Sequence, residues 1–149
     1  MNVAALIAWI LTAGGGFVLL ATWIRNGGQR PSGGSRFRPP VIFGHFALAA
    51  IGLIVWIIYV VTDTEALAWT AFVLLLPVAL LGLTMLTLWI PTYRRHGTLT
   101  GAAQTAAETA TSTLPAERHF PVAVVAGHGV LAVATVVLVL LTALGVGGS

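Results

Sequence analysis

The sequence contains no cysteine and no lysine, and only 7% of its 149 residues are charged. Without cysteine, the chain cannot form disulfides, thiolate metal sites, iron–sulfur clusters or a cysteine nucleophile. A soluble domain carries about a quarter charged residues. Here 58% of the residues are apolar and the mean hydropathy is +0.98. No water-soluble fold of this length can bury so much apolar surface, so the lipid bilayer must be part of its solvent.

The basic character of the chain does not indicate nucleic-acid binding. The sequence pI of about 10.7 results from only seven arginines against four acids. The arginines lie in segments next to apolar stretches, which is typical of membrane topology rather than of a surface that binds DNA or RNA. We therefore expect the lipid bilayer, and no nucleic acid, as a partner.

Four apolar stretches dominate the chain, at residues 3–24, 41–62, 66–90 and 120–144. Each has about 20 residues or more, enough to cross a hydrocarbon core as a helix, and none contains Asp, Glu, Lys or Arg. In lipid every backbone polar group must pair internally, which favours helices. We predict an all-α, four-helix transmembrane bundle in a single domain, with flexible loops at 25–40 and 91–119.

The arginines also predict the orientation of the bundle. All seven fall in the first and third connections, whereas the charged residues of the short second connection are the acids Asp63 and Glu65. Under the positive-inside rule, the first and third connections are cytoplasmic. We therefore predict a multi-pass protein of the bacterial cell (inner) membrane, with both termini on the outer side (N-out/C-out).

A short internal repeat connects the second and fourth stretches. Gly44-His45-Phe-Ala-Leu-Ala aligns with Gly127-His128-Gly-Val-Leu-Ala, and each copy follows a proline. Two helical hairpins in parallel orientation would be related by a pseudo-two-fold axis along the membrane normal, as in some membrane proteins. The repeat therefore predicts such an axis.

The four histidines are the candidate coordinating groups, and they fall into two classes. His96 and His119 neighbour arginines at the expected cytoplasmic surface, where solvation or headgroup contact accounts for them. His45 and His128 lie inside apolar stretches, about 6 and 12 Å beyond the expected starts of their helices. Ionisable residues inside a membrane are costly and are candidates for function.

His45 and His128 could supply both axial ligands of a b-type haem, since helix bundles build cofactor sites from side chains on facing helices. Gly44, Gly127 and Gly129 flank the pair and would let a macrocycle approach the backbone. The same pair could bind a bare metal ion, although two ligands make a poor closed site. The third alternative is that both histidines hydrogen-bond between helices or face quinone or lipid.

Taken as a whole, the chain resembles a group of small, uncharacterised bacterial four-helix membrane proteins. The resemblance rests on the segments Phe43-Gly44-His45-Phe46, Trp56-Ile57-Ile58-Tyr59 and Glu117-Arg118-His119-Phe120-Pro121-Val122. It covers most of the chain and implies the four-helix fold but no activity. A second similarity, to b-type cytochrome membrane anchors, rests only on His45 and His128 and implies a haem.

No catalytic set is recognisable in the sequence, which contains no GxSxG motif, no metal-plus-base set and no paired acids inside a helix. We therefore expect a protein that is not an enzyme. The first hypothesis is an accessory or assembly subunit of a larger membrane complex, such as a respiratory one, with other membrane subunits or a second copy as partners. The alternatives are an electron-transfer protein with a bis-histidine b-haem, and a carrier of a small lipophilic substrate.

Overall fold

The computed structural model describes residues 1–30, 35–94 and 115–146. These residues form four long helices and one short 3-10 helix, and none of them is in a strand. The prediction of an all-helical bundle is therefore confirmed. The elements are α1 (Asn2–Arg25), α2 (Pro39–Thr62), α3 (Glu65–Arg94), η1 (Ala116–His119) and α5 (Val122–Ala143).

Local sequence explains where the helices begin and end. Pro39 and Pro40 occupy the first turn of α2, where a missing backbone N–H costs no helical hydrogen bond. Helix α2 ends at Asp63, whose left-handed backbone (φ 52°) lets its N–H donate to the carbonyl of Tyr59. Because α3 begins at Glu65, α2 and α3 form a tight antiparallel hairpin.

The predicted loop 91–119 differs from the structure at both ends. Helix α3 continues to Arg94 and includes Pro91. Its end packs on η1, where the buried Trp89 donates its indole N–H to the Glu117 carbonyl at 3.2 Å. At the other end, residues 116–119 form η1 rather than an irregular loop. Residues 95–114, which include His96, lie outside the described residues.

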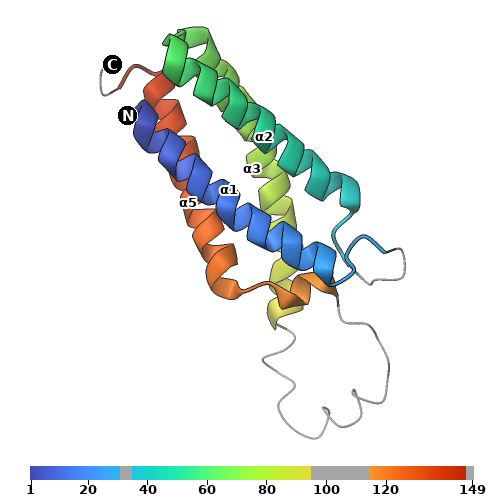
Figure 1. Cartoon of the computed structure of the whole chain (residues 1–149). Helices are drawn as coiled ribbons and strands as arrows, with labels where there is room; N and C mark the ends of the chain where they lie inside the picture. The colour runs from blue at the N-terminus through green and yellow to red at the C-terminus, as the bar shows by residue number, and fades with distance from the viewer. Residues whose placement is uncertain (31–34, 95–114, 147–149) are drawn as a thin grey trace, which may run out of the picture.

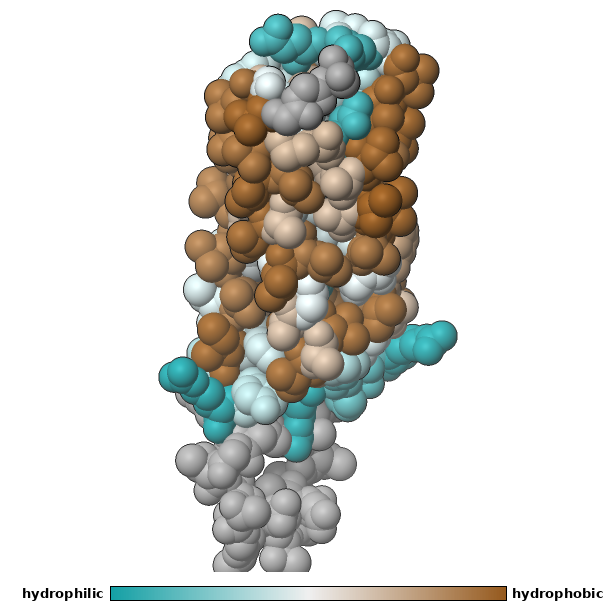
Figure 2. Space-filling view, turned by 90° about the vertical axis from the view of Figure 1, so that its left-hand side faces the viewer, coloured by the Kyte–Doolittle hydropathy of each residue, from teal (hydrophilic) through white to brown (hydrophobic). Residues whose placement is uncertain are grey.

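All four long helices are long and apolar enough to span a membrane. Their outward faces carry large apolar side chains, including Val61, Leu80 and Val130, which are 81%, 67% and 70% exposed. Figure 2 shows hydrophobic surface along the side of the bundle and hydrophilic residues gathered at its ends. A surface of this kind is stable only in contact with lipid, so the chain is a multi-pass transmembrane bundle.

The bundle has two distinct ends. The first and last residues of the described chain lie together at one end, which we call the termini end (Figure 1). The arginine end is the opposite one, where α1 and α3 finish and α2 and α5 begin. The described arginines are Arg25, Arg30, Arg36, Arg38, Arg94 and Arg118, all in the connections or last turns at the arginine end.

The helices pack as two close pairs. Helix α1 packs chiefly against α5, and α2 packs chiefly against α3. Contacts between the pairs, from α1 to α2 and from α3 to α5, are fewer. Among the described residues no close backbone contact joins α2 to α5, so these helices lie diagonally across the bundle.

Matching contacts show the pseudo-two-fold arrangement that the repeat predicts. If α1 corresponds to α3 and α2 to α5, the α1–α5 pair corresponds to the α3–α2 pair, as observed. Phe120 follows Phe37 in the sequence by the same number of residues as His128 follows His45. Both pairs are in ring contact, with centroids 6.0 and 6.3 Å apart. Residues that touch their own symmetry mates must lie near the axis.

Two clusters of buried side chains stabilise the ends of the bundle. At the termini end, Trp9 and Trp56 pack with Leu75 and Val139. At the arginine end, Trp23 and Trp89 pack with Phe37. Between the clusters, none of residues 10–22, 43–51, 79–88 and 122–134 is fully buried. These segments, one from each long helix, define a middle layer that contains no fully buried residue.

A buried carboxylate joins the connections at the arginine end. Glu117 is fully buried, and its two oxygens accept hydrogen bonds from the Ser35 hydroxyl (2.9 Å) and the Arg36 N–H (2.8 Å). The Ser35 oxygen in turn accepts from the Trp23 indole N–H at 2.9 Å. Residues 35–37 of the predicted flexible loop are thus fixed to η1, because a buried carboxylate requires donors.

The orientation across the membrane is a prediction that single cysteines can test, because the chain has none of its own. Thr64 is exposed in the turn at the termini end, and Gln29 is exposed at the arginine end. We expect an impermeant maleimide added to intact cells to label Thr64→Cys but not Gln29→Cys. Permeabilised cells should show labelling of both. Labelling of Gln29→Cys alone in intact cells would reverse the predicted orientation.

Candidate functional site

The two intramembrane histidines lie at the same depth. His45 is six residues after Pro39, the first residue of α2, and His128 is six residues after Val122, the first residue of α5. Each imidazole is therefore about 9 Å into its helix. The offset of several Å expected from the sequence was wrong, because α2 begins two residues earlier and α5 two residues later than predicted.

Each imidazole is held by a backbone carbonyl of the neighbouring helix in its own pair. Nδ1 of His128 lies 2.8 Å from the Thr12 carbonyl oxygen of α1, and Nδ1 of His45 lies 3.0 Å from the Val78 carbonyl oxygen of α3. A carbonyl oxygen can only accept, so Nδ1 must carry the proton in both rings. In the neutral ring, Nε2 then presents a free lone pair.

A glycine four residues after each carbonyl makes room for the ring. A methyl group at Gly16 would lie 3.2 Å from Cε1 of His128, and one at Gly82 would lie 3.3 Å from Cε1 of His45. Such contacts are tighter than ordinary van der Waals packing. Gly16 and Gly82 therefore give the imidazoles access to the helix backbone.

These contacts are equivalent under the pseudo-two-fold axis. Val78 follows Thr12 by the same number of residues as Gly82 follows Gly16. The same interval separates Trp23 from Trp89, whose indoles pack in the arginine-end cluster. The carbonyl, the glycine and the tryptophan thus recur in α1 and α3 as the histidine does in α2 and α5, and the fold builds each half of the site in the same way.

The separation of the two rings matches ligation of one metal ion. Their centroids are 6.3 Å apart and their planes are inclined at 58°, so the rings do not stack. Imidazole nitrogens bind first-row metals at about 2 Å, and each nitrogen is about 1 Å from its ring centre, which gives roughly 6 Å between centroids across one ion. The centroid separation therefore fits ligation of one metal ion by both imidazoles.

The free nitrogens are not enclosed by packed side chains. Among the described residues, neither Nε2 has a hydrogen-bond partner. No enclosed side-chain nitrogen or oxygen in the described chain lacks a partner, so both Nε2 atoms must border accessible space. This agrees with the absence of fully buried residues in the middle layer, where both histidines are half-buried. Leu and Val side chains therefore do not seal the ring nitrogens from their surroundings.

The structure says less about the other candidate residues that were named from the sequence. A methyl group at Gly44, Gly127 or Gly129 would meet no atom within 4 Å, so their suggested role beside a macrocycle stays a prediction. Nδ1 of His119 lies 3.4 Å from the carbonyl of Ala116 within η1, away from the histidine pair. His96 is outside the described residues.

Gly16, Gly82 and the two carbonyls could not be connected with the histidines from the sequence alone. A detectable signal was present, because glycine is followed by tryptophan at the same spacing in Gly16–Trp23 and Gly82–Trp89. Carbonyl acceptors leave no such signal, because every residue has one. They become visible only when the register of α1 on α5 and of α2 on α3 is known.

A bare metal ion fits the pair poorly. Zinc and similar ions take four or more ligands, and the described residues include no group of three or more His, Cys, Asp or Glu side chains suited to a metal. A haem differs because its porphyrin supplies four nitrogens and leaves only the two axial positions to the protein. Comparison of the chain with protein-family models, curated proteins and solved structures gave no match.

The glycine clearance predicts opposite effects for neighbouring substitutions in α1. Gly16→Ala should push the His128 ring from the Thr12 carbonyl and cost about 1–2 kcal/mol through overpacking. Gly14→Ala is the matched control, since its methyl would meet no atom within 4 Å. It should be neutral or slightly stabilising, because alanine favours helix. Thermal unfolding in detergent measures both, and equal melting temperatures would contradict the proposed packing.

Proposed function

We propose that this chain is a transmembrane electron-transfer protein that binds one b-type haem through Nε2 of His45 and Nε2 of His128. The observation that carries the proposal is the histidine pair itself: both rings are anchored by Nδ1, both Nε2 atoms are free, and the centroids are 6.3 Å apart. Hydrogen bonding of the second ring nitrogen to a carbonyl is the usual way proteins orient metal-binding histidines.

The packing of the helices suits a flat cofactor. His128 belongs to the α1–α5 pair and His45 to the α2–α3 pair, and contacts between the two pairs are fewer than those within them. A macrocycle lying between the pairs would receive one axial ligand from each.

The charge distribution suggests how the haem is oriented. The membrane-spanning stretches carry no charged side chain near the histidines, whereas arginines surround the bundle at the arginine end, about 9 Å from the histidine level. The haem carboxylates would therefore point toward the arginine end, where ionic partners and water are available. The bound haem would supply one-electron chemistry, and the chain would hold it in a neutral, apolar site within the cell membrane.

The other hypotheses from the sequence have less support. An accessory or assembly role in a larger membrane complex rests on the lack of a catalytic set, and no contact in the structure adds to it. A carrier for a lipophilic substrate has no observation of its own. The haem proposal is preferred because it alone accounts for two neighbouring imidazoles that are both anchored by Nδ1 and both have a free Nε2.

An absorption spectrum of the protein purified in mild detergent tests the proposal. We expect about one haem per chain and a low-spin spectrum that changes on reduction. His45→Ala and His128→Ala should each abolish the low-spin spectrum, because each removes one axial ligand. His119→Ala is the matched control and should leave the spectrum unchanged. A colourless protein that does not take up added haemin would contradict the proposal, and co-purifying subunits would then favour the accessory role.

A further inference from the structure

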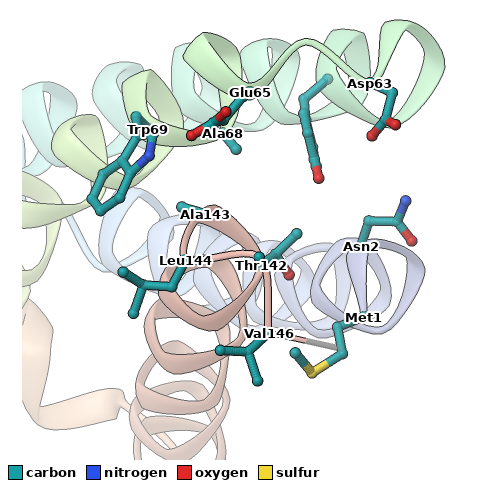
Figure 3. A pocket seen from close by; sticks show the side chains of 12 residues that line it. Met1, Asn2, Asp63, Glu65, Ala68, Trp69, Thr142, Ala143, Leu144 and Val146 are labelled. Atoms are coloured by element: carbon teal, nitrogen blue, oxygen red, sulfur yellow. The ribbon is translucent and has the colours of Figure 1, made fainter. Parts of the chain in front are cut away.

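A second site lies at the termini end, far from the histidine pair. A cavity of about 670 Å³ opens between the α2–α3 turn and the ends of α1 and α5. Figure 3 shows Asp63, Glu65 and Trp69 on the α2–α3 side of this cavity, facing Asn2 and Thr142 on the other. Its volume falls in the range of small-molecule sites, about 300–1,000 Å³.

One polar side chain in this cavity has an unused hydrogen-bonding group. Tyr59 lines the cavity, is only 8% exposed and packs its ring on Trp56 with centroids 4.8 Å apart. No described residue hydrogen-bonds its hydroxyl. Because the described chain has no enclosed oxygen without a partner, the hydroxyl must be accessible, and the cavity is the space that Tyr59 lines. A buried tyrosine normally finds a partner for its hydroxyl, so a ligand or solvent must supply it.

The cavity is electronegative. Asp63 and Glu65 are the only acids in the described part of the termini end, and both line it. Even with the amino group of Met1 counted, the lining carries net negative charge. An anion is therefore disfavoured, and a cation gains from the carboxylates.

We propose that this cavity binds a ligand bearing an organic ammonium group. The carboxylates of Asp63 and Glu65 and the hydroxyl of Tyr59 can accept hydrogen bonds from the ammonium N–H groups. Trp69 also lines the cavity and supplies an aromatic ring, a group that attracts organic cations. The volume far exceeds that of a bare ion, which favours a cation attached to an organic group. The ammonium is either the headgroup of an amine-bearing lipid or a free amine.

Three probes of similar size and different charge test this proposal. The full chain in phosphatidylglycerol nanodiscs is titrated calorimetrically with phenethylammonium, 2-phenylethanol or phenylacetate. Phenethylammonium should bind one per chain, at least about tenfold more tightly than the other two. Equal affinity for all three probes would overturn the proposal.

Conservative variants test the assigned residues without removing packing. Tyr59→Phe keeps the ring on Trp56, and Asp63→Asn suits the left-handed backbone at that position. Each should weaken phenethylammonium binding by about tenfold. Thr64→Ser is the control, because Thr64 does not line the cavity, and it should bind as wild type. Wild-type affinity in both site variants, with folding confirmed by circular dichroism, would overturn the proposal.

The source of the ammonium group is distinguished by the lipid. If nanodiscs containing phosphatidylethanolamine weaken phenethylammonium binding, the headgroup occupies the cavity and is the ligand. If the affinity is unchanged, the ligand is a free amine. The titration does not depend on haem, so its failure would leave the histidine site unaffected.

Discussion

The structure depends on how polar groups are satisfied where there is no water. Inside a bilayer an imidazole needs a partner from the protein, and here each one takes a backbone carbonyl of an adjacent helix. Each of these hydrogen bonds requires two helices to approach closely, and Gly16 and Gly82 allow this. It also fixes the proton on Nδ1 and leaves a free lone pair on Nε2. Packing and chemistry thus follow from the same two hydrogen bonds.

The pseudo-two-fold axis explains why the two histidines lie beside each other. A residue meets its own symmetry mate only near the axis, and both His45–His128 and Phe37–Phe120 do so. The buried clusters at the two ends hold the helices together, and the histidine layer between them contains no fully buried residue. This arrangement supports the proposed haem site between the histidines.

Much of the fold could be predicted from the sequence, because four long apolar stretches without charges have few alternatives in lipid. The repeat around His45 and His128 also predicted the axis. The equal depth of these residues could not be predicted, since helix starts at Pro39 and Val122 depend on local capping. The burial of Glu117 could not be predicted either, because its partners Ser35 and Arg36 are distant in the chain. Carbonyl acceptors and their glycines depend on helix register, which composition does not specify.

Anomalous X-ray diffraction at the iron absorption edge would show whether one iron lies between His45 and His128. In crystals of the purified protein, the haem proposal predicts one iron peak per chain in the middle layer, about 2 Å from Nε2 of His45 and about 2 Å from Nε2 of His128. Both Nδ1 atoms should remain within hydrogen-bond distance of the Thr12 and Val78 carbonyls. An iron peak bound elsewhere, or two imidazoles joined only through water or side chains with no iron between them, would contradict it.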